Sequence, residues 1–438
     1  MRAEATPLLD SNSIRDEDGN SSRDAPTEIQ TTKSPTIVIG IVSFMIFCMT
    51  LSGTLSLIPL GRLIEDAICR RYYGEPGPIE EKRCKVNDIQ AELAWIGGLY
   101  VVIGAVVGGG LPVMVAVIHS IIADVATERA SGFLLMSLGA VLGGVTGPAL
   151  AAKLMELYSP WVPLWVTGFI LTPIAFITII ILPETLHLRR TAQESFSKDQ
   201  SFVAAVRSHL DHAVDRLVES LSMLKTPSLA ILLATFLIQS PVQISEGQTL
   251  AQTISKRFHW TLAQTGYLFS IRGLLTVAVL GFLPAVSSLL TSPRLGRFQL
   301  SVFRKDIVLE QMSLLALVVG SALTGGATFP QVVAGQMIST LAVGGSSMAK
   351  SLVAYYVDAE HTSRLYTLVG MIETVGSFFA GPTLAWMFNT GMRLGGRWMG
   401  LPFFFVAVLC ALALVAVCLV REPQAAKTND DCEAPDDA

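Results

Sequence analysis

The chain has 438 residues, of which 51% are hydrophobic and only 15% are charged, and its mean hydropathy is +0.54. Soluble proteins carry about 25% charged residues, so this composition excludes a soluble globular domain and a nucleic-acid-binding protein. The formal net charge of −4 is unevenly distributed, since the polar tails 1–33 and 421–438 carry −3 and −4 and the stretch between them is therefore +3. Both tails are acidic and poor in aromatic residues, and we expect them to be disordered and cytoplasmic.

Apolar stretches between the tails are long enough to cross a bilayer as helices. A helix needs about 20 apolar residues to span the ~30 Å hydrocarbon core. The ten predicted spans are 36–60, 94–122, 131–153, 161–182, 228–250, 263–290, 308–325, 330–356, 364–390 and 399–420. The predicted fold class is an all-α polytopic membrane protein with about ten transmembrane helices.

The spans fall into two halves. Residues 34–182 contain four spans and an outward loop at 61–93, and residues 228–420 contain six spans. The predicted loops 183–227 and 291–307 carry more Lys and Arg than the loops 251–262 and 389–398, and the bases of the loop 61–93 are balanced by acids. Because loops rich in Lys and Arg usually face the cytoplasm, this distribution favours cytoplasmic N- and C-termini.

The segment 183–227 between the halves has apolar residues at helical spacing from Phe202 to Leu224, with charged residues on the opposite face. This pattern predicts an amphipathic helix that lies at the membrane surface and joins the halves. A regulatory target helix is the alternative.

An internal repeat relates the two halves. A shift of 234 residues aligns Gly110 with Gly344 and the Gly-Pro pair 147–148 with 381–382. Both copies have the same predicted orientation, and parallel repeats of six-span halves occur in one large class of secondary transporters. Compared with the second half, the first half lacks about 64 residues, which is the length of two spans and a loop.

Six segments carry a resemblance to a known family. They are LIPLGRLIEDAICRRYYG (57–74), RCKVNDIQAELAWIGGLY (83–100), PVMVAVIHSIIADVATERA (112–130), LPETL (182–186), FRKDIVLEQMSLL (303–315) and RLYTLVGMIETVGSFFAGP (364–382). The chain resembles fungal, ascomycete members of the major facilitator superfamily that export drugs or other small molecules. The resemblance implies a two-half helical bundle that is monomeric, has no enzymatic activity or cofactor, and exchanges a small molecule with protons across the bilayer.

The chain departs from this family at one place. Such transporters carry a signature loop between their second and third spans, but here IGGLY (96–100) runs directly into VVIGAVVGGGLPVM (101–114). The two spans and the loop that the first half lacks, by comparison with the second half, would lie at the same point. The sequence therefore predicts a proton-coupled secondary transporter that lacks two spans. A transport-dead scaffold or sensor, or a truncated gene-model product, is the alternative.

Arg272 and Glu373 are the charged residues placed deepest in the predicted spans. Counted along their helices, they lie at similar depths in the ~30 Å core. We expect them to form a buried pair, either as a proton-coupling element of the transport cavity or as a structural salt bridge. Lys350 is expected to reach the cytoplasmic interface, and His119 is either a satisfied interior histidine or a proton relay.

Gln239, Gln243 and Glu246 are spaced so that they share one helix face. This polar face lines a cavity or bonds neighbouring helices. Two matching cytoplasmic loops carry four charges, Asp124, Arg129, Asp358 and Arg364. These charges resemble the gating contacts of the superfamily, and ordinary solvated loop charges are an equal alternative.

Gly139, Gly143 and Gly147 recur every four residues in one predicted span. Small residues at this spacing let two helix backbones approach closely. The run also resembles the antiporter signature of the superfamily, which implies a hinge.

Cys69 and Cys84 lie in the same non-cytoplasmic loop, where oxidation is permitted. We predict a disulfide between them.

Glu4, Leu8 and Leu9 fit an acidic dileucine sorting pattern. We therefore expect an integral protein of the plasma membrane or of a vacuolar or endosomal membrane.

Overall fold

The computed structural model describes residues 35–77, 79–108, 129–181, 226–291, 302–357 and 362–420. These residues form ten helical segments that are long and apolar enough to cross a membrane, as predicted. The two tails and nearly all of the linker 183–227 lie outside the described residues.

The first four spans form the N-terminal half. Their elements are α1 (Pro35–Tyr73), η1 (Glu81–Cys84), α2 (Asn87–Gly108), α4 (Arg129–Leu157), α5 (Trp161–Val166), η2 (Thr167–Leu171) and α6 (Thr172–Ile181). The last three elements are consecutive and build one span.

The other six spans form the C-terminal half. The first of these spans consists of α8 (Pro227–Thr235), η3 (Phe236–Ile238), α9 (Gln239–Ile244), η4 (Ser245–Thr249) and α10 (Leu250–Phe258). It is followed by α11 (Leu262–Thr291), α12 (Val302–Thr324), the span made of α13 (Phe329–Thr340), η6 (Leu341–Gly344) and α14 (Gly345–Ala354), then α15 (Thr362–Leu394), η8 (Gly396–Gly400) and α16 (Leu401–Cys418).

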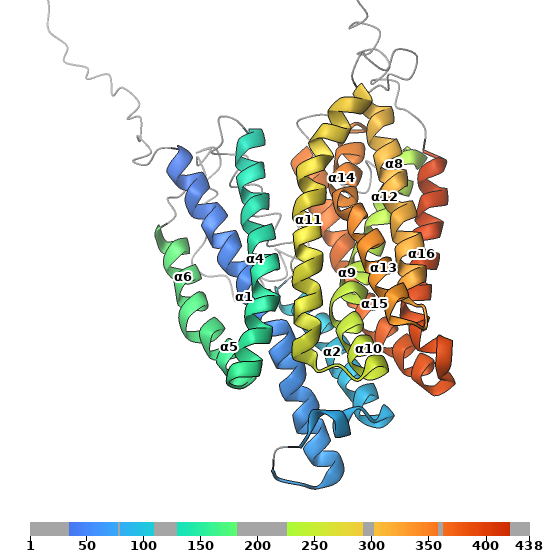
Figure 1. The fold of residues 1–438 in the computed structure, drawn as a ribbon. Coiled ribbons are helices and arrows are strands. Elements are labelled where there is room, and N and C mark those ends of the chain that lie inside the picture. The colour runs from blue at the N-terminus through green and yellow to red at the C-terminus, as the bar shows by residue number, and fades with distance from the viewer. Residues whose placement is uncertain are drawn as a thin grey trace, which may run out of the picture.

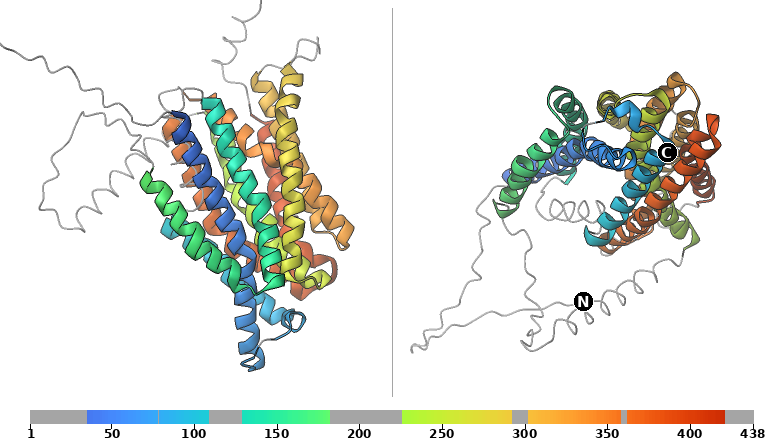
Figure 2. Two further views of the ribbon diagram at one scale, coloured as in Figure 1. Left: turned by 60° about the vertical axis from the view of Figure 1, so that its left-hand side comes forward. Right: turned by 90° about the horizontal axis from the view of Figure 1, so that it is seen from below.

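Helices α1, α4, α5 and α6 stand together on one side of the molecule, and α8 to α16 stand on the other (Figure 1). Helix α4 lies along α1, as two further views show (Figure 2), and on its other side it packs against α11. Helix α2 packs most extensively against α15 of the C-terminal half rather than against α1. The pairs α2–α15 and α4–α11 therefore form the main junction between the halves.

The predicted outward loop 61–93 is wrong in its extent. Helix α1 continues to Tyr73 and α2 begins at Asn87, so that only the short segment 74–86 connects them. Residues 61–73 are too polar to count as a span, but Ile64, Ile68 and Cys69 pack against the residues that follow. A helix can extend beyond the membrane wherever it has such a packing partner, and α1 projects beyond its neighbours at this end of the bundle (Figure 1). We call this end the disulfide end.

The glycine stripe of α4 faces α1. A Cβ atom on Gly139 would lie 2.6 Å from the carbonyl oxygen of Ser43, and one on Gly143 would lie 2.8 Å from the backbone nitrogen of Leu51. Gly147 is in similar contact with the Thr54 side chain. Close helix packing therefore accounts for the spacing of these glycines.

We predict that Gly143→Ala will destabilise the α1–α4 pair by about 1–3 kcal/mol, because its methyl group would meet backbone atoms that cannot move independently. The matched control is Gly144→Ala, whose Cβ would lie 4.0 Å from the nearest atom, a methyl group of Thr50. Thermal unfolding of the detergent-purified proteins, followed by circular dichroism, compares the two variants. Equal melting temperatures would contradict the packing role of Gly143.

Candidate functional site

Arg272 of α11 forms an ion pair with Glu246, which lies in the π-helical turn η4. Its Nε atom also donates a hydrogen bond to Thr340 Oγ1 at 3.2 Å, and its Nη1 donates to the Glu246 carbonyl oxygen at 3.4 Å. Both side chains are mostly buried. The pair thus connects three spans of the C-terminal half through one guanidinium group.

Lys350 of α14 forms a second ion pair, with Glu373 of α15, at 3.6 Å between Nζ and Oε1. The carboxylate is mostly buried, whereas the lysine is partly exposed. On the far side of the contact, Ser240 donates a hydrogen bond to the Glu373 carbonyl oxygen at 2.9 Å and lies 2.7 Å from the hydroxyl of Ser377.

The predicted pair of Arg272 with Glu373 is therefore wrong, and Lys350 is the cation that pairs with Glu373 instead. Depth along a helix is only one coordinate, and the side on which the residue lies also decides its partner. Helix α11 packs against α4, α13 and η6, whereas α15 packs against α2, α9 and α16. The two charges consequently find different partners at similar depths.

The polar face of the first C-terminal span is only partly buried. Gln243 is exposed, while Gln239 and Glu246 are half-buried. Ser240, next to Gln239 in the chain, is buried against Glu373. This arrangement leaves Gln243 free to meet solvent or a ligand, and it uses Glu246 in the contact with Arg272.

The two halves are in close contact along α2 and α15 and, nearer the disulfide end, between α4 and α11. A Cβ atom on Gly98 of α2 would lie 2.9 Å from the backbone of Gly381 in α15, and one on Gly266 of α11 would lie 2.8 Å from the Pro148 carbonyl oxygen of α4. Tyr267 of α11 donates a hydrogen bond to Glu156 of α4 at 2.7 Å. Two recesses lie at this contact, one beside α1 and α11 and the other beside α15. The walls of the first recess are mainly apolar and those of the second are mixed, and both contain the amide side chains of Gln248 and Gln252.

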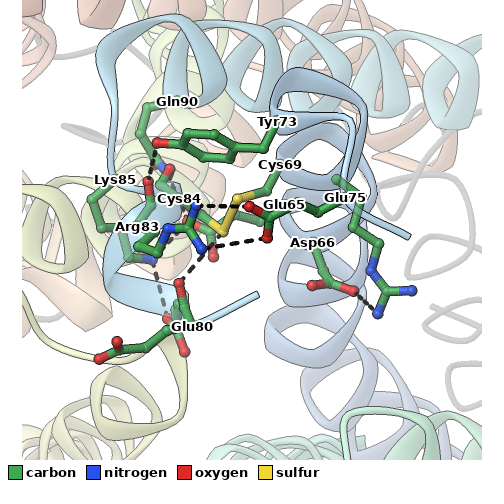
Figure 3. Close-up of a disulfide and its surroundings, with 12 residues drawn as sticks. Glu65, Asp66, Cys69, Tyr73, Glu75, Glu80, Arg83, Cys84, Lys85 and Gln90 are labelled. Carbon is green, nitrogen blue, oxygen red and sulfur yellow. Dashed lines mark hydrogen bonds and ion pairs between the residues drawn. A yellow bond between two sulfur atoms is a disulfide. The ribbon is translucent and has the colours of Figure 1, made fainter. Parts of the chain in front are cut away.

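Cys69 of α1 and Cys84 of η1 are joined by a disulfide, with 5.4 Å between their Cα atoms (Figure 3). Both residues are completely buried together with Ile89 at the start of α2. At the surface of the same segment, Arg83 pairs with Glu75 at 3.0 Å and lies over the ring of Tyr73. The hydrogen bond to Glu75 raises the pKa of the Arg83 guanidinium.

A buried ion pair lies next to the disulfide. Glu65 of α1 is 0% exposed, and one of its oxygens is 2.6 Å from the Lys85 ammonium and accepts a hydrogen bond from Gln90 at 2.6 Å. Arg62 reaches the other oxygen at 3.2 Å. The sequence analysis missed this cluster because Glu65 and Lys85 lie in a stretch with many charges, where solvation is the usual expectation. The signal that could have revealed it is that the two residues flank the cysteines, with Glu65 one helical turn before Cys69 and Lys85 directly after Cys84.

Two buried carboxyl groups of α12 were also missed. Asp306 accepts a hydrogen bond from Ser351 at 2.7 Å, whereas Glu310 has one buried oxygen with no hydrogen-bond partner among the described residues. Both residues are near one end of a predicted span, where charges are ordinarily solvated.

The remaining candidates cannot be placed. His119, Asp124 and Asp358 lie outside the described residues, and nothing is described of the side chains of Arg129 and Arg364. Their roles in proton relay or gating remain predictions.

Comparison with known proteins finds one family that is similar to part of the chain. Residues 91–304 match the Major Facilitator Superfamily. The MFS efflux pump atnC of Emericella nidulans is 28% identical over 338 residues, which cover 76% of this chain and 64% of the pump. The MFS-type transporter aprT of Aspergillus flavus is 24% identical, and the alignment covers 85% of this chain and 86% of that protein.

Solved structures share the fold. The human organic anion transporter MFSD10 has a TM-score of 0.52 and 16% identity, covering 88% of this chain and 100% of its own. A POT family transporter in complex with 5-aminolevulinic acid has a TM-score of 0.54 and 12% identity, covering 87% of this chain and 95% of its own. The chain is therefore an all-helical protein with ten candidate membrane spans that is similar to transporters of the Major Facilitator Superfamily, and its sequence is distantly similar to fungal MFS efflux pumps.

Proposed function

We propose that the protein is a secondary active transporter that moves a small organic molecule out of the cytoplasm at the expense of a proton gradient. The observation that carries this proposal is the presence of two ion pairs, Arg272–Glu246 and Lys350–Glu373, within membrane-spanning helices of one half. Charges at such depth are costly and usually belong to a substrate or proton pathway.

The recesses between the halves support a mainly apolar substrate. The recess beside α1 and α11 combines mainly apolar walls with the two amides of Gln248 and Gln252, and a few polar groups in an apolar pocket are typical of small-molecule sites. The name of the efflux pump atnC supports export as the direction.

The proposed cycle follows from the contact at the disulfide end. In the proposed orientation, with both termini in the cytoplasm, this end faces outward. The halves are closed there by the close approach of Gly266 to Pro148 and by the Tyr267–Glu156 hydrogen bond. Substrate would enter from the cytoplasmic end and leave once these contacts separate.

Glu373 is the proposed proton carrier. Protonation would remove its charge and release Lys350, which is partly exposed and can then interact with solvent or with a substrate. Loss of the proton on the other side of the membrane would restore the pair. The coupling thus requires a carboxyl group that alternates between a paired, charged form and an unpaired, neutral form.

We predict that Glu373→Gln will abolish proton-coupled transport while the protein still folds. Glutamine mimics the neutral carboxyl group and cannot exchange a proton. Proteoliposomes that contain the pH-sensitive dye pyranine are mixed with a library of small apolar organic compounds. A compound that drives proton movement through the unmodified protein is expected to cause none through Glu373→Gln.

The matched control is Glu75→Gln, which removes an exposed carboxylate outside the spans that pairs with Arg83 and does not touch the ion pairs. It should retain proton movement. Normal coupling in Glu373→Gln would refute the role of Glu373. An unmodified protein that moves protons with no compound in the library would favour a transport-dead scaffold or sensor.

We also propose that the N-terminal half lacks two spans. Four of the ten candidate spans precede the linker and six follow it, and α2 of the short half packs mainly against α15. A gene-model error that removed a coding segment would produce the same chain. Transcript sequencing tests this, since such an error predicts additional coding sequence between Tyr100 and Val101.

A further inference from the structure

Glu81 of η1 crosses from the N-terminal half to the C-terminal half. Its Oε1 atom accepts a hydrogen bond from the backbone nitrogen of Leu262 at 2.8 Å. Leu262 is the first residue of α11, where the N–H groups have no partner within the helix and carry a partial positive charge. Glu81 therefore caps a helix that belongs to the opposite half.

The Glu81 carboxylate satisfies a backbone donor that the residues at the N-terminus of α11 do not satisfy themselves. Thr261 donates its backbone N–H to the Gln264 side chain at 3.0 Å, and Gln264 donates its backbone N–H to the Thr261 hydroxyl at 3.2 Å. These reciprocal bonds satisfy two donors in the manner of a capping box. The N–H of Leu262 lies between them and is satisfied from the other half.

A second contact crosses at the same place. Lys256, near the end of α10, donates a hydrogen bond to the backbone carbonyl of Lys85. Within its own half, Glu81 is held by Lys85 at 3.0 Å and by Arg62 at 3.4 Å. The segment 74–86 thus contacts both α10 and the start of α11, on either side of the turn that connects these two helices.

The disulfide determines where these contacts can form. It connects Cys84, the last residue of η1 and the neighbour of Lys85, to Cys69 within α1. Because Lys85 and Glu81 both lie within four residues of Cys84, the bond fixes their distance from the body of the half. Without it, the segment would be held to α1 only by non-covalent contacts such as the Glu65–Lys85 and Arg62–Glu81 ion pairs.

We propose that the segment 74–86 is a clasp that holds the disulfide end closed, with Glu81 as a removable cap on α11 and the Cys69–Cys84 disulfide as the element that keeps the cap in place. The proposal rests on the proposed transporter function, in which the halves separate alternately at each end. A single carboxylate at a helix N-terminus is a modest contact, so the clasp biases the closed state and still allows it to open. Weakening the clasp shifts the population towards the open state.

Double electron–electron resonance measures this population without a substrate. Spin labels are placed on Tyr158→Cys, after the end of α4, and Trp398→Cys, in η8. These residues are 71% and 55% exposed and lie in opposite halves at the disulfide end. The full-length background keeps the disulfide and replaces the remaining four cysteines, Cys48, Cys410, Cys418 and Cys432, with serine.

In Glu81→Gln, the population at long distance is expected to rise about 2- to 5-fold, the range that the loss of a charge at a helix N-terminus implies. Glu75→Gln is the matched control, because it removes the same charge from the same segment but loses only a contact with Arg83 within that segment. Its distances should equal those of the unmodified background. Cys69→Ser with Cys84→Ser should raise the long-distance population as well.

Equal distance distributions in Glu81→Gln and Glu75→Gln would overturn the clasp. If Glu81→Gln does not give monodisperse protein, Glu81→Asp replaces it, since the shorter acid keeps the charge but cannot span both halves. An unchanged distribution in Glu81→Asp would overturn the clasp in the same way. The measured distance distribution does not depend on the proton-flux assay, which tests only the proposed transport function.

Discussion

Replacing Lys85 with methionine is expected to lower the free energy of unfolding by about 3–5 kcal/mol, the usual cost of leaving one charge of a buried pair alone. Glu65 is 0% exposed and the Lys85 side chain only 4% exposed, with 2.6 Å between the charged atoms. Methionine preserves the length and apolar stem of lysine but removes the positive charge. Gln90 and Arg62 still reach Glu65, so the loss should be partial rather than complete.

Two variants test the cause of this loss. Lys82→Met removes an exposed lysine three residues earlier in the same segment and should leave stability unchanged. Combining Lys85→Met with Glu65→Gln removes both charges and should recover most of the loss, because no uncompensated charge remains. Thermal unfolding of the purified proteins distinguishes these cases. A double variant as unstable as Lys85→Met would show that shape, not charge, is responsible.

Replacing Arg272 with glutamine is expected to reduce the transport rate at least about tenfold, which corresponds to about 1.4 kcal/mol in the barrier. The change leaves Glu246 without its cation and removes the hydrogen bond to Thr340. Both effects disturb the contact among three spans. The rate is measured in proteoliposomes with whichever compound first drives proton movement.

A charge-exchange variant tests whether transport requires the ion pair itself or only one of its two residues. Arg272→Glu combined with Glu246→Arg restores opposite charges at the same place, and we expect it to recover part of the rate that either single change removes. A rate in Arg272→Gln equal to that of the unmodified protein would show that the pair does not take part in transport. Equal losses in the exchange and single variants would assign the effect to the orientation of the pair rather than to its net charge.

The helical spans could be predicted from the sequence because hydropathy is a local property. Every predicted span corresponds to a helical segment of the structure. The ends of the helices were less predictable, as α1 shows. Its last turns are too polar for a span, and they are helical because Ile68 and Cys69 pack against the segment that the disulfide holds.

The sequence by itself determined the membrane class, the two-half organisation and the choice of Cys69 and Cys84 as partners. These depend on composition, on an internal repeat, and on two cysteines lying in one short stretch. Only the tertiary structure decided that Arg272 meets Glu246, that Lys350 meets Glu373, and that Glu81 caps a helix of the other half. The physical reason is that spacing along a chain gives depth and helix face, whereas the partner of a buried charge depends on which helices pack side by side and at what rotation.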